Sequence, residues 1–489
     1  MEQRGVNKRH RPHKQGRTER KLVPNLQGNG ASYSPVKAEQ EEQNVKQKAR
    51  EMIAQVLRPQ NLQKALQQVI ANKGSAGIDG LKTTELKTYV QKHKEVLLET
   101  VKENQYLPQS ILGVEIPKGG GKTRLLGIPT VVDRLLQQAV SQVLMPKFEY
   151  EFHENSYGFR PYKNARTAVG KALSNIHEGY NHIVAIDLQT FFDEVDHCLL
   201  LNLLYRKVKC PVTLRLIRKW LRVPIQIKGK LVKRRKGVPQ GSPLSPLLSN
   251  ILLNELDKEL ERRKLKFVRY ADDFSIYCKR PSDAKLVSKA ITKYLVERLK
   301  LKVNAKKSGI VKPVKFTILG FTFASTYQKG VKGAYQLTVG EKAWAKLKEK
   351  LKAVTRKTLP TSLAERIVKI NEITRGWLTY FKGSSIVGKL RDIDGWLRNR
   401  LRYCIWTDWK KPERKRKNLL RLGVDADHAY AWSRTRKGGW RIAQSPILNT
   451  TITIKRLKQK GYIPMLEIYT KLNPSVYEPP YTRPVRTVV

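Results

Sequence analysis

Two adjacent carboxylates near the middle of the chain limit its possible folds more than any other feature. The segment KFVRYADDFSIY (266–277) reads as two short apolar strands joined by a turn that carries Asp272 and Asp273. Such a turn presents both side chains at the tip of a hairpin. A lone Asp-Asp pair in this position is usually an Asx-type turn. Adjacent like charges repel, however, so placing them where two strands meet has a folding cost.

A third carboxylate, Asp187, ends another apolar run, HIVAID (182–187), which we also predict to be a strand. If this strand neighbours the hairpin in one sheet, Asp187 and Asp272 converge on one edge of that sheet. Three clustered carboxylates repel strongly unless cations lie among them, and sites lined by carboxylate oxygens favour Mg²⁺. Two such ions about 3.5–4 Å apart can activate an attacking hydroxyl and stabilise a leaving oxygen in phosphoryl transfer. The pattern therefore predicts a metal site.

The rest of the chain is strongly basic. Its 489 residues include 96 Lys and Arg against 41 Asp and Glu, a net charge of +55. Self-repulsion of this size strains a compact chain unless an anionic partner neutralises it; nucleic acid is the first candidate and a membrane surface the second. No run approaches the ~18 apolar residues of a membrane span, and the basic N-terminus lacks the apolar core of a signal peptide. We expect a cytoplasmic protein of bacterial type that binds nucleic acid and no membrane.

The chain divides into five parts by composition and period. Residues 1–45 are polar with basic clusters and read as a disordered arm, and residues 46–105 read as helices. In residues 106–330 short β-rich runs alternate with helical ones. Residues 340–423 are helical and heavily basic, and residues 424–489 form a small basic segment. This order predicts a mixed α/β body followed by a helical domain.

Several elements of the body can be placed from their pattern. Strands are expected at residues 182–187, 224–234, 267–277 and 316–323. Helices are expected at residues 83–104, 166–176, 246–263 and 283–300.

A series of segments follows in one order along the chain. They are IPKGGGKTRLLGIPTVVDRLLQQAV (116–140), NSYGFRPYKNARTAV (155–169), AIDLQTFFDEVDH (185–197), GVPQGSPLSPLLSNILLNELD (237–257), YADD (270–273) and LKVNAKKSG (301–309), followed by FTILGFTF. In that order they resemble the motifs of reverse transcriptases, specifically of the group II intron type that combines reverse transcriptase and maturase activities. Any one segment alone is weak, but the ordered set is specific. The resemblance runs from about residue 50 to the C-terminus.

The resemblance implies an α/β (α+β) right-hand polymerase with a small antiparallel sheet flanked by helices. Residues 106–330 would form its fingers and palm, after a helical extension of the fingers at 46–105. The segments ITRGWLTYFKGSS and DGWLRNRLR resemble the helical thumb, or maturase domain, at 340–423. The segment KGGWRIAQSPILNTTIT (437–453) resembles the small DNA-binding segment that follows the thumb. We expect the form that lacks the Cys- and His-rich endonuclease domain of many relatives.

The resemblance also implies roles for the carboxylates. Asp187 and Asp272 match residues that ligate two Mg²⁺ ions, and Asp273 is expected nearby as a support or weaker ligand. Lys307 matches a late-palm lysine that could protonate the departing pyrophosphate. The implied chemistry is nucleotidyl transfer by a two-metal-ion mechanism.

A second group of residues matches the family's nucleotide-binding positions. Lys118 and Arg124 match fingers residues that grip the triphosphate, and both lie on a Gly-rich hairpin that suits closure over a polyanion. Gln240 matches a residue beside the incoming nucleotide, and Gly241 would permit close approach of the backbone. Phe192 stands where the family places a bulky gate against the sugar 2′-hydroxyl. Phe offers that hydroxyl neither room nor a polar partner, so we expect synthesis of DNA.

Basic and aromatic residues interleave along residues 340–423, which suits contact with an RNA backbone and stacking on bases. The candidate RNA-binding residues are Arg375, Lys382, Arg398, Arg414, Lys415 and Arg416. The interleaved aromatics are Trp377, Tyr380, Phe381, Trp396 and Trp406. Amphipathic helices also use aromatics to build their own core, and we expect this of about half of the five.

The favoured function is that of an RNA-directed DNA polymerase that binds its own intron RNA. It would assist splicing as a maturase and support mobility by target-primed reverse transcription. Its partners would be group II intron RNA, an RNA template with a DNA primer, target DNA and dNTPs, and its oligomeric state stays open.

Three other functions are alternatives to this one. A splicing-only RNA chaperone would have a vestigial polymerase site, which intact Asp187, Asp272, Asp273, Phe192 and Gln240 argue against. A domesticated reverse transcriptase in phage defence or CRISPR spacer acquisition would be recognised by its genomic surroundings. A viral RNA-dependent RNA polymerase fits least, given the aromatic gate and the maturase-like thumb.

Overall fold

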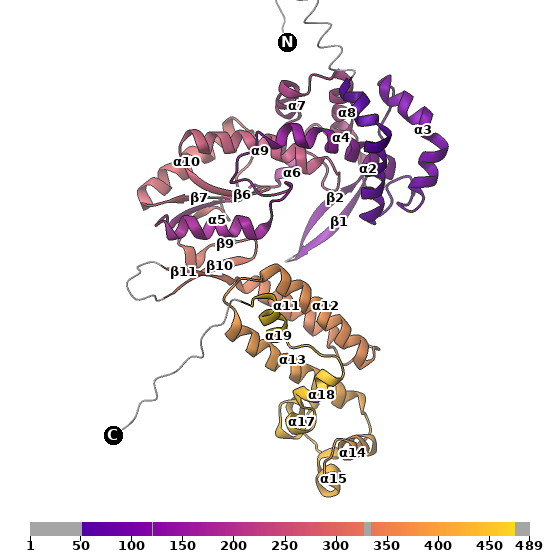
Figure 1. Ribbon diagram of the computed structural model, residues 1–489, viewed down its shortest axis with the longest axis vertical. Coiled ribbons are helices and arrows are strands. Elements are labelled where there is room, and N and C mark those ends of the chain that lie inside the picture. The colour runs from indigo at the N-terminus through magenta and orange to yellow at the C-terminus, as the bar shows by residue number, and fades with distance from the viewer. Residues whose placement is uncertain (1–50, 120, 327–333, 475–489) are drawn as a thin grey trace, which may run out of the picture.

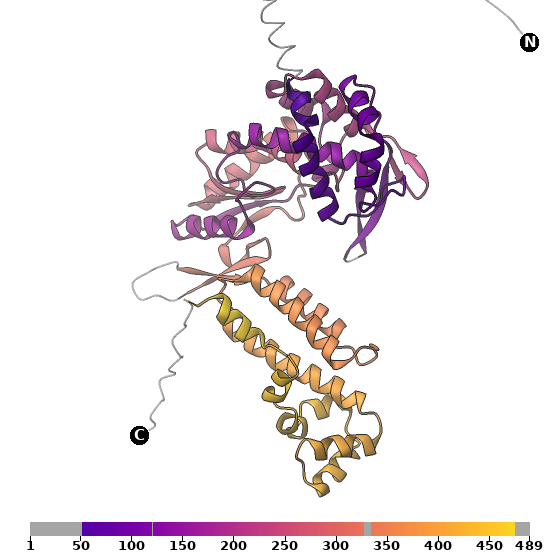
Figure 2. The ribbon, with the colours of Figure 1, turned by 45° about the vertical axis from the view of Figure 1, so that its right-hand side comes forward.

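The computed structural model of the chain describes residues 51–119, 121–326 and 334–474. The predicted arm at 1–45 lies outside the described residues, as do the last residues of the predicted C-terminal segment. Figures 1 and 2 show a first part that combines helices with small sheets, and a second, elongated helical part that follows it. Within the described ranges, no helix is both long and apolar enough to cross a membrane.

The first part contains all the described strands. Up to residue 232 its elements are α2 (Pro59–Ala71), α3 (Leu86–Lys102), β1 (Ile111–Gly119), β2 (Lys122–Ile128), α4 (Val131–Glu149), α5 (Ala165–His177), β3 (His182–Ile186), α6 (Phe191–Glu194), α7 (His197–Lys207), α8 (Pro211–Arg222), β4 (Ile225–Ile227) and β5 (Lys230–Val232). They are followed by α9 (Ser245–Arg262), β6 (Lys266–Tyr270), β7 (Asp273–Cys278), α10 (Pro281–Glu297), β8 (Gly309–Val311), the 3₁₀ turn η1 (Pro313–Lys315), β9 (Thr317–Ile318), β10 (Phe321–Ser325) and β11 (Tyr335–Val339). The strands form three small sheets, ordered β2-β1-β4-β5, β6-β7-β3-β8 and β11-β10-β9.

The second part is helical throughout its described residues. Its elements are α11 (Glu341–Val354), α12 (Leu363–Phe381), α13 (Val387–Asp408), α14 (Pro412–Arg421), α15 (Ala426–Ser433), α16 (Gly439–Ala443), α17 (Pro446–Thr451), α18 (Ile454–Gln459) and α19 (Met465–Leu472). The local sequence sets some of these boundaries. α12, for example, begins with a capping box, in which the Ser362 hydroxyl accepts from the Glu365 N–H and the Glu365 carboxylate accepts from the Ser362 N–H.

The sheet ordered β6-β7-β3-β8, called here the central sheet, is antiparallel at every pairing. β6 and β7 form a hairpin, and β7 also pairs with β3, with Phe274 opposite Ile186. The prediction that the strand before Asp187 neighbours the Asp-Asp hairpin is therefore confirmed. All positions of β7 after Asp273 are buried, as expected of a strand covered on both faces.

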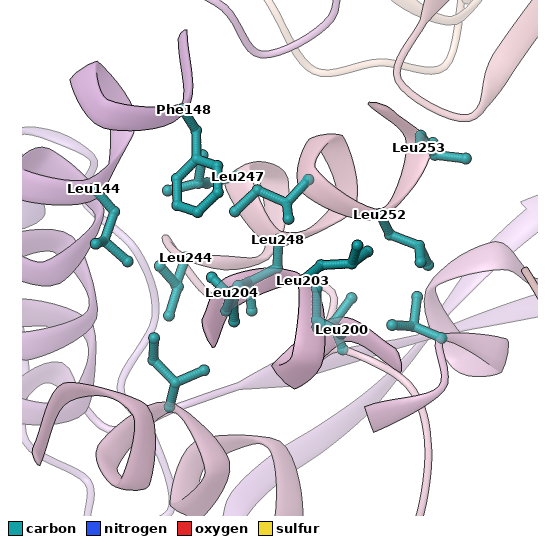
Figure 3. Close-up of a cluster of buried hydrophobic side chains, with 14 of the residues drawn as sticks. Leu144, Phe148, Leu200, Leu203, Leu204, Leu244, Leu247, Leu248, Leu252 and Leu253 are labelled. Carbon is teal, nitrogen blue, oxygen red and sulfur yellow. The ribbon is translucent and has the colours of Figure 1, made fainter. Parts of the chain in front are cut away.

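The leucine-rich faces of α4, α7 and α9 form a core beside this sheet (Figure 3). The side chains labelled there are Leu144, Phe148, Leu200, Leu203, Leu204, Leu244, Leu247, Leu248, Leu252 and Leu253, all of them buried. The same cluster includes Ile186 and Phe274, which directly adjoin two of the predicted catalytic carboxylates. Truncating a buried leucine costs about 2–5 kcal/mol, so this packing holds the strand ends firmly.

A second core cluster begins on the opposite face of the central sheet and continues into the helical part. It contains Ile183 and Tyr277 from the sheet, Phe321 from β10, and Trp344 and Phe381 from α11 and α12. Residues on alternate positions of a strand face opposite sides, which is why neighbouring residues of β3 enter different clusters. The two parts of the molecule therefore share one of their cores.

Most predicted elements of the body are present. α3, α5, α9 and α10 correspond to the four predicted helices, with boundaries shifted by a few residues. The strand predicted at 316–323 is wrong as one unit, because the structure divides it into β9 and β10. Leu319 and Gly320 both have positive φ, +52° and +85°, and this two-residue turn reverses the chain between them.

Candidate active site

The Asp-Asp hairpin turns through only two residues, Ala271 and Asp272. Tyr270 and Asp273 close the turn as the last pair of the ladder, so Asp273 begins β7 instead of lying in the turn as the pattern predicted. Ala271 has φ +57°, in the left-handed region, which costs a non-glycine residue about 1–2 kcal/mol. The tip of the hairpin is therefore strained, and surrounding contacts must hold it.

A buried arginine holds this turn from behind. The Arg269 guanidinium donates to both carboxylate oxygens of Asp257, at 2.7 and 2.5 Å, and both side chains are 0% exposed. It also donates to Asn250 Oδ1 at 3.0 Å and to the Ala271 carbonyl oxygen at 3.1 Å. Gly158 approaches the turn so closely that a Cβ there would lie 2.3 Å from the Ala271 nitrogen. These contacts tie the strained turn to α9 and to the segment before α5.

Sequence reasoning missed this network, although a signal was present. Arg269 interrupts the apolar strand FVRY, and Asp257 ends the apolar stretch NILLNELD. A charged side chain is rarely buried unless it is paired. Two residues of opposite charge at positions expected to be buried therefore indicate an ion pair between them.

The segment between α10 and β8 positions Asp187, which directly follows β3. The Asp187 N–H donates to Ser308 Oγ at 3.0 Å, and its Oδ2 accepts from Asn304 Nδ2 at 3.0 Å. The Asn304 N–H donates to the Asp187 carbonyl at 2.8 Å. Lys307 Nζ lies 3.4 Å from Asp187 Oδ2, so this predicted residue is at the site. Asn304 and Ser308 were not anticipated from the sequence.

The carboxylates are close enough to influence one another. Asp187, Asp273 and Lys307 line one cavity of about 330 Å³. The Asp273 side chain keeps access to solvent, yet partial desolvation, then the charge of Asp272, then that of Asp187 raise its pKa to about 6, while Lys307 opposes the rise. A cation bound between these groups would stabilise the ionised form of Asp273.

The donor set fits a hard divalent cation, because it consists of carboxylate oxygens. Across the residues that the structure describes, no three His, Cys, Asp or Glu side chains already stand close enough together to hold one ion. The carboxylates stand along one edge of the central sheet, where a divalent cation would take its remaining ligands from water or from substrate phosphates.

A larger cavity, of about 790 Å³, brings together Arg124, Phe192, Gln240 and Gly241. Arg124 Nε donates to Gln240 Oε1, and the Gln240 carbonyl accepts from the Gly127 N–H at 2.8 Å. Gly241 has φ +123°, and a Cβ there would lie 2.5 Å from the Gly127 carbonyl oxygen, so only glycine fits. The close approach at Gly241 is thus to strand β2.

The predicted site residues fall into two sets, one at the carboxylate edge and one in the larger cavity. Phe192 belongs to the second set: it lies on the short helix α6, lines the larger cavity and packs, half-buried, against the core cluster of α4, α7 and α9. Lys118 belongs to β1, which Figure 1 shows as part of a long hairpin beside this region. The side chain of Lys118 lies outside the described residues.

The predicted RNA-binding residues are spread along the helical part. Arg375 is exposed on α12, Lys382 directly follows that helix and is half-buried, and Arg398 is half-buried on α13. The structure does not bring these three into one cluster with the bases of α14.

The three bases of α14 differ from one another. Arg414 is exposed, whereas Arg416 Nη1 lies 3.6 Å from Glu413 Oε2. Lys415 lies over Trp406, with Nζ 4.6 Å from the ring centroid, and burial lowers its pKa. Lys415 therefore packs against the protein as well as carrying charge.

The five interleaved aromatics divide between core and surface. Phe381 and Trp406 are buried at 5% and 3% exposure, so stacking on RNA is wrong for these two. Trp377 and Trp396 are half-buried and pack against the same core cluster. Tyr380 is exposed and its hydroxyl donates to the Leu319 carbonyl. Four of the five aromatics thus belong to or pack against the core, which is more than the expected half.

Comparison with known proteins gives two family matches in this chain. Residues 116–323 match the family described as reverse transcriptase (RNA-dependent DNA polymerase). Residues 344–423 match the family described as group II intron, maturase-specific domain. Both families act on nucleic acid, and polymerases of the first generally use divalent metal ions.

Two known proteins and one solved structure are similar to parts of this chain. Protein YkfC of Escherichia coli (strain K12) is 29% identical over 295 residues, which are 52% of this chain and 77% of YkfC. Group II intron-encoded protein LtrA of Lactococcus lactis subsp. cremoris is 35% identical over 215 residues, which are 44% of this chain and 36% of LtrA. A solved structure described as a partial Cas6-RT-Cas1--Cas2 complex is 28% identical, with a TM-score of 0.33, over 51% of this chain and 43% of that one.

The match thus spans most of YkfC but only about a third of LtrA. The two family matches follow each other in one chain, in the order that the sequence motifs predicted. The chain therefore contains a segment that matches the reverse transcriptase family, followed by a segment that matches the group II intron maturase-specific domain.

Proposed function

We propose that this chain copies RNA into DNA with a right-hand polymerase architecture. Residues 106–330 would act as fingers and palm, and residues 340–423 as the thumb. One observation carries the proposal: Asp187 directly follows β3 and Asp273 begins the adjacent strand β7, so carboxylates gather at one edge of the central sheet. Clustered carboxylates of this kind support a divalent-cation site for nucleotidyl transfer.

Asp187, Asp272 and Asp273 would hold two Mg²⁺ ions, which when bound supply activation of the primer 3′-hydroxyl and stabilisation of the leaving oxygen. Arg124, which lines the larger cavity with Gln240 and Phe192, would bind the triphosphate of the incoming dNTP. Lys307, beside Asp187, would carry a proton near the departing pyrophosphate.

Phe192 would exclude the 2′-hydroxyl of a ribonucleotide. It lines the same cavity as Arg124 and Gln240 and is half-buried against the core, so its ring has little freedom to move aside. A Phe192→Ala variant should incorporate ribonucleotides at least about tenfold better relative to dNTPs, a difference of ~1.4 kcal/mol. Unchanged discrimination would remove Phe192 from this role.

We further propose that the helical part binds the chain's own intron RNA and thereby assists splicing. Target DNA would supply the primer for reverse transcription, which would support mobility of the intron. The basic composition and the exposed Arg375 and Arg414 support this. These roles require a cytoplasmic protein with access to RNA and DNA. A steep fall with salt concentration in the protein's affinity for duplex or structured RNA would support this proposal.

The test of the polymerase is extension of a DNA primer on an RNA template. Asp272→Ala and Asp187→Ala should each reduce extension by more than about 10³-fold while RNA affinity stays within about twofold. Asp392→Ala is the matched control, since Asp392 is exposed on α13 and should be neutral. Substantial extension by either active-site variant would remove these residues from the metal site.

A further inference from the structure

A cavity of about 490 Å³ in the helical part is lined by side chains that polymerisation does not use. Aromatic and cationic groups from three helices meet there: Lys348 and Lys352 of α11, Trp396, Arg400 and Tyr403 of α13, and Trp440 of α16. On α13 the three residues are spaced four and three apart, which places them along one face of the helix. We call this the α11–α13–α16 cavity.

Arg400 is held in a fixed position at this cavity. Its Nε donates to Thr355 Oγ1 at 3.0 Å and its Nη2 donates to the Thr355 carbonyl at 2.6 Å. Its guanidinium carbon lies 5.7 Å from the ring centroid of Trp440 and 5.9 Å from that of Tyr403. Among the described residues, Arg400 forms no ion pair with a carboxylate, and its side chain lines the cavity.

The aromatic wall is also built closely. Tyr403 and Trp440 meet edge to face, with centroids 5.8 Å apart and an interplanar angle of 87°. Gly439 permits this contact, because a Cβ there would lie 3.2 Å from Tyr403 Cε2 and 3.5 Å from Trp406 Cδ1. Trp440 nevertheless stays 37% exposed. A large aromatic that is held against the protein yet left open to solvent suits a flat ligand.

The charges indicate which flat ligand. Lys348, Lys352 and Arg400 bring three positive charges, against one negative charge from Glu349 in the same wall. Aromatic faces and a guanidinium plane bind nucleobases by stacking, and lysines bind the flanking phosphates. Glu349 offers an acceptor to an exocyclic amino group of a base.

We propose that the α11–α13–α16 cavity binds one unstacked base of single-stranded RNA, with its phosphate on Lys348 and Lys352. The proposal rests on the proposed binding of intron RNA by the helical part, and it names the element of RNA that is recognised. Unpaired loops and bulges are the places where RNA bases are free to leave the stack, whereas a regular duplex offers none.

The experiment measures the affinity of the full chain for three fluorescein-labelled oligonucleotides at one salt concentration: a single-stranded RNA, the same sequence as DNA, and a blunt RNA duplex. Trp440→Ala should weaken binding of single-stranded RNA by about 5- to 150-fold, the range of stacking on one base. It should change duplex binding by less than about twofold. Trp440→Phe keeps a ring and should retain most of the affinity.

Tyr430→Ala is the matched control. Tyr430 is 52% exposed on α15 and also stacks with an arginine, Arg434, at 3.8 Å, but it lies outside the cavity. It should leave the affinity for single-stranded RNA unchanged. Arg400→Lys keeps the positive charge but removes the planar guanidinium group. It should therefore weaken binding of single-stranded RNA without changing the affinity for the RNA duplex.

Three outcomes overturn the proposal. The first is that Trp440→Ala weakens binding of single-stranded RNA no more than Tyr430→Ala does. The second is that Trp440→Ala weakens binding of single-stranded RNA and of the RNA duplex equally. A loss on DNA as large as that on RNA would overturn the assignment to RNA. Primer extension by the same preparations distinguishes failure of this proposal from failure of the proposed function. If the wild-type protein extends primers and Trp440→Ala binds single-stranded RNA as well as the wild type does, only the proposal for the cavity is rejected. If the wild-type protein neither extends primers nor binds RNA, the proposed function is rejected.

Discussion

Replacing Arg269 with methionine tests whether the buried network behind the hairpin holds the catalytic turn. Arg269 and Asp257 are fully buried and joined by hydrogen bonds of 2.7 and 2.5 Å. Arg269→Met leaves the Asp257 carboxylate buried without its partner, which should lower the free energy of unfolding by about 3–5 kcal/mol. Adding Asp257→Leu should restore most of that loss, because apolar side chains then replace the whole ion pair.

The rate of primer extension should not recover together with the free energy of unfolding in the double variant. Both variants remove the donor that lies 3.1 Å from the Ala271 carbonyl oxygen, so the φ of +57° at Ala271 loses a contact that holds it. Leaving a buried acceptor unpaired costs about 1–3 kcal/mol, or roughly 5- to 150-fold in rate if the turn must regain its geometry at each turnover. We expect the double variant to recover its stability but not its rate of extension.

The assay combines urea unfolding, followed by tryptophan fluorescence, with extension of a DNA primer on RNA. Arg262→Met is the matched control, because the Arg262 side chain is 68% exposed and its pair with Glu259, at 2.8 Å, lies at the surface. Such pairs contribute less than about 1 kcal/mol. The reasoning is refuted if Arg269→Met costs no more than Arg262→Met, or if the double variant regains extension together with stability.

Three further predictions concern the same site and the charge of the chain. Gly158→Ala places a Cβ 2.3 Å from the Ala271 nitrogen and should slow primer extension at least about tenfold, whereas Gly170→Ala, with nothing within 4 Å, should not. Asn304→Leu removes the 3.0 Å donor to Asp187 Oδ2 and should lower the extension rate about 5- to 20-fold without weakening RNA binding, as measured by filter binding. Log affinity for RNA should fall with log salt by about 0.7 per phosphate neutralised on single strands, and a flat titration would contradict an electrostatic origin.

Local pattern was enough to predict three of the four strands of the central sheet. β3, β6 and β7 are apolar runs of strand length, whereas the short strand β8 was not predicted. Because Asp187 directly follows β3 and the Asp-Asp turn joins β6 to β7, the approach of these carboxylates followed from strand pairing alone. Four helices were predicted from the helical period of their apolar residues, whereas α4, α7 and α8 were not.

Contacts between remote residues could not be predicted in the same way. Asn304 lies 117 positions from Asp187, and the sequence marks it only as a polar residue in a loop. The turn at Leu319 was hidden for a different reason, because an apolar residue with positive φ gives no turn signal beyond the glycine that follows it. Periodicity places a base such as Lys415 on a helix but does not say which ring it covers.

The boundary between the two family matches is not a boundary of the hydrophobic core. The reverse transcriptase match ends at residue 323 and the maturase-specific match begins at residue 344. Across this interval, Phe321 of β10 lies 4.8 Å from Phe381 of α12 by ring centroids, and the same cluster reaches Tyr277 in the strand that Asp273 begins. We therefore expect a substitution inside this cluster to affect strand β7, which Asp273 begins, as well as the helical part.

This continuity decides which residues can separate RNA binding from synthesis. Trp406 belongs to the shared cluster and Lys415 covers its ring, so reversing the charge of Lys415 also disturbs packing. Arg375 and Arg414 are exposed, and neither has an ion pair with a carboxylate of the described residues. A loss of splicing assistance at those two positions, with primer extension intact, can be attributed to lost contact with RNA, because the core that supports Asp273 is left unchanged.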